Sequence, residues 1–559
     1  MTRGARAPAS HKPAAARPRR RLLTVAVGVM ALIGLGVGVT VGLGTAPGDG
    51  PPTVEQKADY ADILPAPASA VAIGGRFTVT ASTGVFAPPD NAAARGVADS
   101  LAALLRPATG YPLKVGTGGE SGGGIRLVLV GGGTTKTADD DRLGAEGYRL
   151  DVSDRQVTIR ANQPAGLFHG VQTLRQLLPP ALESKKVQHA AWVVPSGHIV
   201  DFPQFGYRGA GLDVARHFFS VADVERYIGQ IALYKIDYLH LHLTDDQGWR
   251  IAIDGWPRLT AVGASTEVGG GAGGFYTQAE YRKLVAYAKA RYVTIIPEVD
   301  VPGHVTAALA SYPNLSCDGK PRTPTTTIAV GFSSLCAGKP ATYRFLDDVV
   351  KQLAALTAGP YVAIGGDEAQ ATSAADYTKI VDHAAADVRA DGKTPWGWQE
   401  TTSASIGTPA VAAYWSTGSP TAAVKRAASA GTKLVLMPAS HAYLDQKYDN
   451  TTALGLHWAG YVGVQAAYNW DPVSYLPGVD PSAVLGVEAD LWTETVVTDS
   501  DIDYMAFPRL PAVAELGWSS DATHNWNAFK LRLAAQAPRW DALGMNYYKS
   551  PEVPWPDHG

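Results

Sequence analysis

This sequence has few cysteine and methionine residues, and neither sign of charge is in large excess. Its 559 residues include two Cys and five Met, and 48 Lys and Arg nearly balance 51 Asp and Glu, for a formal net charge of −3. This balance argues against a polyanion-binding surface, and no basic stretch interleaved with aromatic residues indicates a nucleic-acid partner. Two cysteines are also too few to indicate a metal site. We therefore expect no nucleic acid, metal or cofactor.

Charge is absent altogether from one long run, residues 22–46, "LLTVAVGVMALIGLGVGVTVGLGTA". At about 1.5 Å per residue, a helix of this length spans a bilayer of about 30 Å. Residues 1–21 before it carry seven Lys and Arg and no acid, which predicts a cytoplasmic N-terminus and an extracellular remainder. We favour a signal anchor or transmembrane segment, followed by a linker over residues 47–60. A cleaved signal, giving a secreted protein, is the alternative, and "RRRLL" loosely resembles a twin-arginine export signal.

The two cysteines, Cys317 and Cys336, would meet an oxidising environment outside the cytoplasm. We expect them to form one disulfide that closes a loop. Two buried free thiols are the alternative.

Residues 61–200 have the pattern of a small α/β domain. "RFTVTAS" and "IRLVLVG" resemble strands, and "NAAARGVADSLAALLRPATG" has helical periodicity that ends at Gly110. "GYRLDVSDRQVTIRA" indicates a hairpin, and "AGLFHGVQTLRQLLP" a helix that prolines end. Because no chemical constellation occurs here, we interpret the segment as a supporting domain.

Residues 201–559 alternate between strands and helices. The strand candidates are "YRGAGLDV", "IDYLHLHL", "YVTIIPEV", "YVAIGGDE", "TPWGWQ", "AVAAYW", "KLVLMP" and "VLGVEADLW". Eight such units predict a (β/α)8 TIM barrel with loop insertions. A doubly wound open sheet is the alternative, but no glycine-rich phosphate-binding fingerprint opens a helix.

Active sites of such barrels lie at the carboxyl ends of the strands. The eight predicted ends carry Arg216; Asp245 and Asp246; Asp300 and His304; Asp367 and Glu368; Trp398; Trp415; Tyr443 and Asp445; and Trp492 and Glu494. Acids and an arginine bind hydroxyl groups, and indoles stack on the apolar faces of sugar rings. The set therefore predicts a carbohydrate substrate.

Several motifs in this region together resemble those of the family 20 glycoside hydrolases, the β-N-acetylhexosaminidases. They are "GLDVARHFF", "HLHLTDDQGWR", "IIPEVDVPGH", "IGGDEAQ", "WGWQE" and "LWTE", and the resemblance covers about residues 205 to 545. The small α/β domain also fits the family's usual layout, as a domain of the hexosaminidase N-terminal type.

The resemblance implies a retaining hydrolase that removes terminal β-linked N-acetylhexosamines without a carboxylate nucleophile. The substrate's own 2-acetamido group would attack the anomeric carbon and give an oxazolinium intermediate. Glu368 would then be the general acid and base, and Asp367 would orient the acetamido group. Repulsion between these neighbours would help keep Glu368 protonated while Asp367 stays ionised.

Further roles follow from the same resemblance, motif by motif. Asp245 and His304 would form a relay supporting Glu368, while Asp246 and Asp300 would hold loops. The substrate-binding residues would be Arg216, Asp445 and Glu494 for the hydroxyls, Trp398, Trp415 and Trp492 around the acetamido methyl, Tyr443 on its carbonyl, and Trp458 against the next sugar.

Two other functions stay open at this point. His240 and His242 in "HLH" share a face of a strand, as metal ligands of a hydrolase do in some barrels. They precede the predicted strand end, however, and a place in the core or against the helix layer is favoured. A non-catalytic glycan-binding protein is the second alternative. Release of lacto-N-biose, the choice between GlcNAc and GalNAc, the natural glycan and the oligomeric state are also open.

Overall fold

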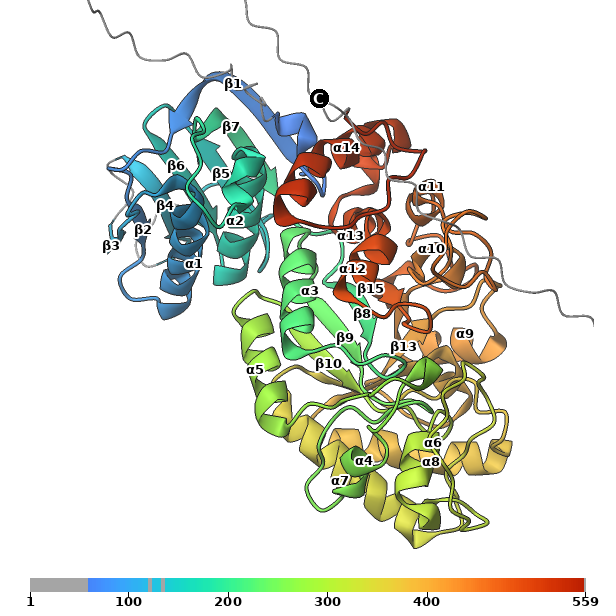
Figure 1. Cartoon of the computed structure of the whole chain (residues 1–559). Coiled ribbons are helices and arrows are strands. Elements are labelled where there is room, and N and C mark those ends of the chain that lie inside the picture. Colours follow the sequence, from blue (N-terminus) through green and yellow to red (C-terminus); the bar gives the residue numbers. More distant parts are fainter. Residues whose placement is uncertain (1–58, 119–122, 132–135, 557–559) are drawn as a thin grey trace, which may run out of the picture. The chain divides into compact units, whose positions relative to one another are not determined.

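The computed structural model describes residues 59–118, 123–131 and 136–556 (Figure 1). The predicted cytoplasmic N-terminus, the apolar segment and nearly all of the linker lie outside the described residues. Within the described ranges, no helix has both the length and the apolar character needed to span a bilayer.

The first part of the described chain folds as a seven-stranded mixed sheet in the order β1-β7-β5-β6-β4-β2-β3. Its strands are β1 (Ser69–Thr78), β2 (Val85–Ala87), β3 (Val115–Thr117), β4 (Gly124–Leu129), β5 (Tyr148–Val152), β6 (Gln156–Ala161) and β7 (Val193–Asp201). The predicted hairpin is confirmed, because β5 and β6 pair antiparallel. Strand β7 was not predicted, since Pro195 and Gly197 interrupt its sequence pattern.

The helices of this part are α1 (Ala92–Thr109) and α2 (Pro164–Leu177), with the short helices η1 (Tyr60–Asp62) and η2 (Pro180–Glu183). The side chain of Asn91 caps α1 by accepting a hydrogen bond from the Ala94 N–H. The helix ends at Gly110, as predicted, and this residue has a left-handed conformation.

Eight parallel strands then close into a barrel (Figure 1). They are β8 (Tyr207–Asp213), β9 (Tyr238–His242), β10 (Thr294–Glu298), β11 (Tyr361–Ala363), β12 (Thr394–Trp398), β13 (Val411–Tyr414), β14 (Lys433–Leu436) and β15 (Val484–Leu491). Every strand candidate from the sequence contributes one of them. The (β/α)8 prediction is confirmed, and the open-sheet alternative is wrong because β15 pairs with β8.

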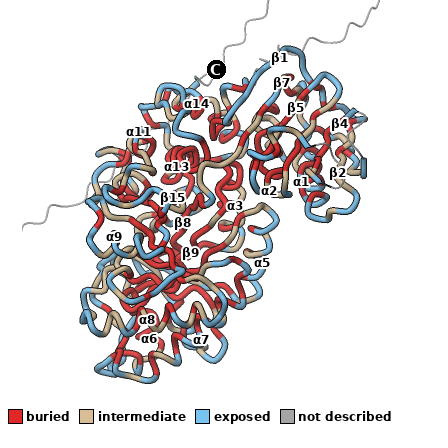
Figure 2. Tube along the Cα trace, turned by 180° about the vertical axis from the view of Figure 1, so that it is seen from behind, coloured by how far each residue is buried: buried red, intermediate tan, exposed pale blue. Residues whose placement is uncertain are grey.

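Helices surround the barrel, whose strands β8, β9 and β15 run through the buried interior (Figure 2). The helices are α3 (Val221–Leu233), α4 (Arg258–Ala261), α5 (Gln278–Lys289), α6 (Thr306–Ser311), α7 (Pro340–Leu356), α8 (Ala374–Ala390), α9 (Ala422–Ser429), α10 (Ala439–Ala442), α11 (Val464–Tyr468), α12 (Asp499–Ala506), α13 (Arg509–Trp518) and α14 (Trp526–Leu543). Capping boxes start α3, α5 and α12. Further short helices are η3 (Val268–Gly270), η4 (Pro313–Leu315), η6 (Pro481–Ala483) and η7 (Asp521–Thr523).

One connection departs from the regular alternation of strand and helix. Between β12 and β13 the described chain forms only a short 3-10 helix, η5 (Gln399–Ser403), in place of a full α-helix. This segment begins immediately after Trp398. The residues that follow the strand therefore stay at the carboxyl end of the barrel.

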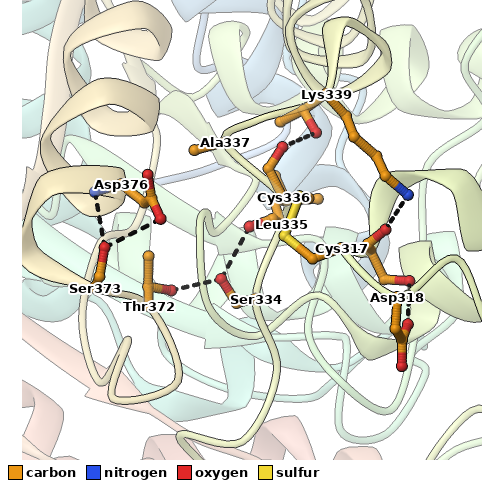
Figure 3. The surroundings of a disulfide bond; sticks show 12 residues. Cys317, Asp318, Ser334, Leu335, Cys336, Ala337, Lys339, Thr372, Ser373 and Asp376 are labelled. Atoms are coloured by element: carbon orange, nitrogen blue, oxygen red, sulfur yellow. Dashed lines mark hydrogen bonds between the residues drawn. A yellow bond between two sulfur atoms is a disulfide. The ribbon is translucent and has the colours of Figure 1, made fainter.

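A disulfide joins Cys317 to Cys336, as predicted, so the free-thiol alternative is wrong (Figure 3). The loop that it closes contacts the loops after three neighbouring strands. Ser333 Oγ donates to Asp246 after β9 at 2.7 Å, and the Leu335 N–H donates to the Pro302 carbonyl after β10 at 3.0 Å. Ser334 Oγ lies 2.7 Å from the Thr372 hydroxyl after β11. The disulfide loop thus links three segments at one end of the barrel.

Reduction of the disulfide should destabilise the protein. Closing a loop with a sequence separation of 19 restricts the unfolded chain, an effect of about 3 kcal/mol. Urea unfolding followed by tryptophan fluorescence should therefore show a lower midpoint when a reductant is present. The double variant Cys317→Ser/Cys336→Ser serves as the control, since its midpoint should not respond to the reductant. Equal midpoints for oxidised and reduced wild-type protein would contradict this prediction.

Candidate active site

Asp367 and Glu368 follow β11 in a segment whose backbone leaves the strand conformation. Gly365, Gly366 and Glu368 have φ angles of 67°, 100° and 44°. Glycine is required at 365, because a Cβ there would lie 1.9 Å from Asp300 Oδ1. Since the segment is no longer extended, side-chain alternation does not send the two acids to opposite faces. Both approach His304, whose Nε2 lies 3.8 Å from Asp367 Oδ2 and 3.5 Å from Glu368 Oε2.

His304 lies between this pair and Asp245, and the relay expected from the sequence stays a prediction. Its Nδ1 lies 3.1 Å from Asp245 Oδ1. Burial opposes the charged ring, but the carboxylates of Asp245, Asp367 and Asp300 raise the pKa of His304 well above its ordinary value. Burial likewise opposes ionisation of Asp245, yet Arg216 and His304 hold the pKa of that carboxyl well below its usual range. An imidazolium therefore lies between the Asp245 carboxylate and the acid pair.

The chain of contacts extends from Asp245 into the barrel interior. His242 joins Asp245 to Glu298, with Nε2 2.9 Å from Asp245 Oδ2 and Nδ1 2.6 Å from Glu298 Oε2. His240 joins Glu298 to Glu488, both at 2.9 Å. All of these side chains are buried. Alternating imidazoles and carboxylates thus run through the barrel from Glu488 to the acid pair.

This arrangement does not favour metal binding by the two histidines of "HLH". Despite their burial, the neighbouring carboxylates raise the pKa of His242 to about 9 and that of His240 well above its ordinary value. Both nitrogens of each ring lie within 2.9 Å of a carboxylate oxygen, and these ion pairs account for the two histidines without a metal. The core position favoured for these residues is confirmed. The expectation that both histidines precede the strand end was wrong for His242, which is the last residue of β9.

Aromatic rings from four strand ends form one connected wall. The ring centroids of Trp398 and Trp492 lie 5.6 Å apart, and those of Trp492 and Tyr443 lie 6.0 Å apart. Tyr443 is in turn 6.5 Å from Trp415 and 6.0 Å from Trp458. Trp398 is buried, whereas 55% of Trp458 is exposed. The wall therefore runs from the barrel interior to the surface.

Two carboxyl groups that sequence reasoning missed hold indoles of this wall. Trp398 Nε1 donates to Glu298 Oε1 at 2.9 Å, and Trp415 Nε1 donates to Glu400 Oε2 at 3.2 Å. Glu298 ends β10 and faces the barrel interior, so only closure of the barrel brings it to β12. Glu400 stands in the "WGWQE" motif, which was the one available signal.

Arg216, Asp445 and Glu494 form the polar side of the site. Arg216 Nη2 lies 2.9 Å from Asp245 Oδ2, and its guanidinium lies 5.1 Å from the centre of the Trp492 ring. Burial and the charge of Glu494 raise the pKa of Asp445 well above its ordinary value. Among the residues that the structure describes, Asp445 Oδ1, Glu494 Oε2 and Arg216 Nε have no hydrogen-bond partner. Buried polar atoms are normally paired, so these atoms suit the hydroxyl groups of a ligand.

Asp246 and Asp300 hold loops, as the sequence predicted. Asp246 Oδ1 accepts hydrogen bonds from Thr306 N and Oγ1 and from Ser333 Oγ. Asp300 Oδ1 accepts from the Gly366 N–H at 3.0 Å. Burial and the nearby Asp367 raise the pKa of Asp300 well above its usual range.

Asp367 experiences opposing influences on its ionisation. Burial raises the pKa of this carboxyl, and repulsion from Glu368 adds to the rise. The positive charge of His304 and a hydrogen bond with Asp300 oppose it. On balance the pKa of Asp367 is raised, so the surroundings of this carboxyl do not favour its ionised form, contrary to the expectation from the sequence.

The arrangement can supply a proton and stabilise a positive charge beside an aromatic wall. The predicted residues Arg216, Asp245, His304, Asp367 and Glu368 are joined by close contacts, and the predicted aromatic residues form the wall; their roles stay predictions. Such a combination suits the cleavage of a glycosidic bond, whose transition state is positively charged.

Comparison with known proteins agrees with this chemistry. The model of the glycosyl hydrolase family 20 catalytic domain matches residues 205–521, and that of glycosyl hydrolase family 20, domain 2, matches residues 60–202. A β-N-acetylhexosaminidase of Cellulomonas fimi is 42% identical over 87% of this chain and 95% of its own length.

Solved structures agree as well. The family 20 β-N-acetylhexosaminidase of Streptomyces coelicolor A3(2) superposes with a TM-score of 0.85 at 51% identity, covering 89% of this chain and 99% of that one. A mutant Streptomyces plicatus β-hexosaminidase in complex with its product GlcNAc has a TM-score of 0.85 at 52% identity, covering 89% and 98%. The chain therefore belongs to glycosyl hydrolase family 20 and is a glycoside hydrolase.

Proposed function

We propose that this protein is a retaining β-N-acetylhexosaminidase, which removes terminal non-reducing N-acetylglucosamine or N-acetylgalactosamine by substrate-assisted catalysis. The observation that carries the proposal is the adjacent pair Asp367 and Glu368, which shares His304 and lies near the aromatic wall. Retaining enzymes with a carboxylate nucleophile hold their two carboxyl groups about 5 Å apart across the scissile bond. Neighbouring acids suit instead the substituents of two neighbouring carbons of the sugar ring. The GlcNAc complex of the Streptomyces plicatus relative supports the substrate class.

In the first step Glu368 donates its proton to the glycosidic oxygen, and the bond from that oxygen to the anomeric carbon breaks. The carbonyl oxygen of the 2-acetamido group forms a bond to the anomeric carbon from the opposite face, giving an oxazolinium ion. In the second step Glu368 accepts a proton from water, whose oxygen attacks the anomeric carbon and reopens the ring. Two inversions leave the configuration unchanged.

Asp367 acts on the acetamido group. Its carboxylate accepts the hydrogen bond of the acetamido N–H, orients the group and stabilises the positive charge that develops there. The Tyr443 hydroxyl donates to the acetamido carbonyl oxygen and fixes its direction of attack. His304 and Asp245 support Glu368 between the two steps.

The remaining side chains bind the sugar. Arg216, Asp445 and Glu494 bind its hydroxyl groups, and their unpaired atoms support this role. Trp398, Trp415 and Trp492 enclose the acetamido methyl, which gains from leaving water. The exposed Trp458 stacks on the next sugar.

We also propose that the enzyme acts outside the cytoplasm, either secreted or held at the membrane by residues 22–46. The disulfide supports this location, because disulfides persist in oxidising compartments. Release of lacto-N-biose from a wider pocket is a second candidate activity. Non-catalytic glycan binding is disfavoured by the acid pair, since binding alone does not need a proton donor.

A substrate analogue with a 2-hydroxyl in place of the 2-acetamido group should be nearly inert. Without the acetamido group the intramolecular nucleophile is lost, and we expect kcat/KM to fall by at least about 1,000-fold. The measurement compares aryl β-glucoside with aryl N-acetyl-β-glucosaminide carrying the same leaving group. Similar rates on the two would exclude substrate assistance, and no release from either would favour the binding protein.

The two acids should separate by their response to the leaving group. Glu368→Gln should lose about 100- to 10,000-fold in kcat/KM on alkyl glycosides, which need protonation, and far less on nitrophenyl glycosides, which do not. Asp367→Asn should lose about 100- to 1,000-fold on both, because the acetamido group attacks in either case. Equal losses of Glu368→Gln on the two substrates, or a wild-type rate in either variant, would show that the roles are wrongly assigned.

A further inference from the structure

Glu400 lies beside the acid pair but has no part in the mechanism above. It belongs to η5, the short helix that replaces a full α-helix after β12. Its Oε2 accepts the Trp415 indole N–H at 3.2 Å. The adjacent Gln399 accepts the Ser416 backbone N–H through Oε1 at 3.3 Å. Two consecutive side chains of η5 therefore hold two consecutive residues at the end of β13.

Trp415 is the ring through which this contact reaches the site. It lies nearly parallel to Tyr443, with centroids 6.5 Å apart and an interplanar angle of 18°, and it forms a T-shaped contact with Trp458, with centroids 5.9 Å apart. The ring is only partly buried, so packing alone restricts it less than it restricts Trp398. A hydrogen bond at the indole nitrogen removes the remaining rotation.

We propose that Glu400 is a positioning residue that fixes the Trp415 indole in the wall around the substrate's acetamido methyl group, and through it the ring of Tyr443. This inference rests on the proposed function, because it assumes that Trp415 encloses that methyl group. It assigns Glu400 to selectivity for the N-acyl group rather than to proton transfer.

The surroundings of Glu400 favour its neutral form. Burial raises its pKa to about 8, with repulsion from Asp367 and Glu368 as further causes, against the Trp415 hydrogen bond and its own backbone. Tyr377 and Tyr443 also face it, and the pKa of each phenol is raised above its ordinary value, first by burial. Below pH 7 Glu400 therefore accepts the indole N–H without adding a further negative charge beside the acid pair. A glutamine amide oxygen can accept the same hydrogen bond.

The test compares N-acetyl with N-propionyl glycosides of the same leaving group. One additional methylene is discriminated by about 10- to 200-fold in a well-fitted pocket. In Glu400→Ala we expect the ratio of kcat/KM for the two substrates to fall at least about 5-fold, with a rise in KM for the N-acetyl substrate. Glu400→Gln should restore most of the wild-type ratio. Ser403→Ala is the matched control, since it removes from η5 only a hydrogen bond to the Glu400 backbone carbonyl.

Two further measurements separate positioning from other roles. The pH profile of Glu400→Gln should follow that of wild type from pH 5 to 7, since both side chains are neutral there. Trp415→Phe keeps a ring but loses the N–H, so it should reproduce the loss of selectivity, and adding Glu400→Ala to it should change the ratio no further.

The proposal is overturned if Glu400→Ala keeps the wild-type ratio, or if Glu400→Gln loses it as fully as Glu400→Ala does. If Glu400→Ala does not fold, the other two variants still test the proposal. A pH profile of Glu400→Gln that differs from that of wild type contradicts it, and so does an unchanged substrate ratio in Trp415→Phe. Failure of the proposed function can be told apart from failure of this proposal, because it would appear in the wild-type enzyme as activity on the 2-hydroxyl analogue.

Discussion

Compensation of buried charge inside the barrel is the constraint on which the site depends. Glu298 is fully buried and lies between His240 and His242. Despite burial, these two rings hold the pKa of Glu298 well below its usual range. A charged group in such a place is stable only when it is paired and hydrogen-bonded. The same pairing continues through Asp245 and His304, so the positive ring beside the acid pair is anchored far below the surface.

The aromatic wall depends on this network as well. Trp398 donates its indole N–H to Glu298, so one buried carboxylate orients two imidazoles and an indole. Trp415 has its own acceptor in Glu400, nearer the solvent. Large rings are the best material for enclosing a methyl group, but they need a fixed orientation to form a selective pocket. Glu298 orients Trp398 in the barrel interior, and Glu400 orients Trp415 nearer the solvent.

The sequence indicated the barrel and nearly the whole site, for a physical reason. Strands buried on both sides have long apolar runs, and the polar residues that follow each run must lie at one end of the barrel. Residues whose roles depend on closure were not predicted. Glu298 resembles any buried strand acid until β10 and β12 lie in one barrel, and Glu400 resembles any acid after a strand. Strand β7 was missed because Pro195 and Gly197 obscure its pattern. The predicted apolar segment over residues 22–46 stays a prediction.

The adjacency of Asp367 and Glu368 follows from the geometry of the proposed substrate. Its glycosidic oxygen and its acetamido nitrogen are attached to neighbouring ring carbons, so the two acids that serve them must also be neighbours. A regular strand cannot aim neighbouring side chains at one target. A left-handed conformation at Glu368 solves this problem, at a cost of about 1–3 kcal/mol for a residue other than glycine. Gly365 allows the close approach of Asp300, which holds the Gly366 N–H, and the disulfide loop braces the segment at Thr372. The contacts that surround the pair therefore maintain a strained turn, which a mechanism with a carboxylate nucleophile on a separate strand would not require.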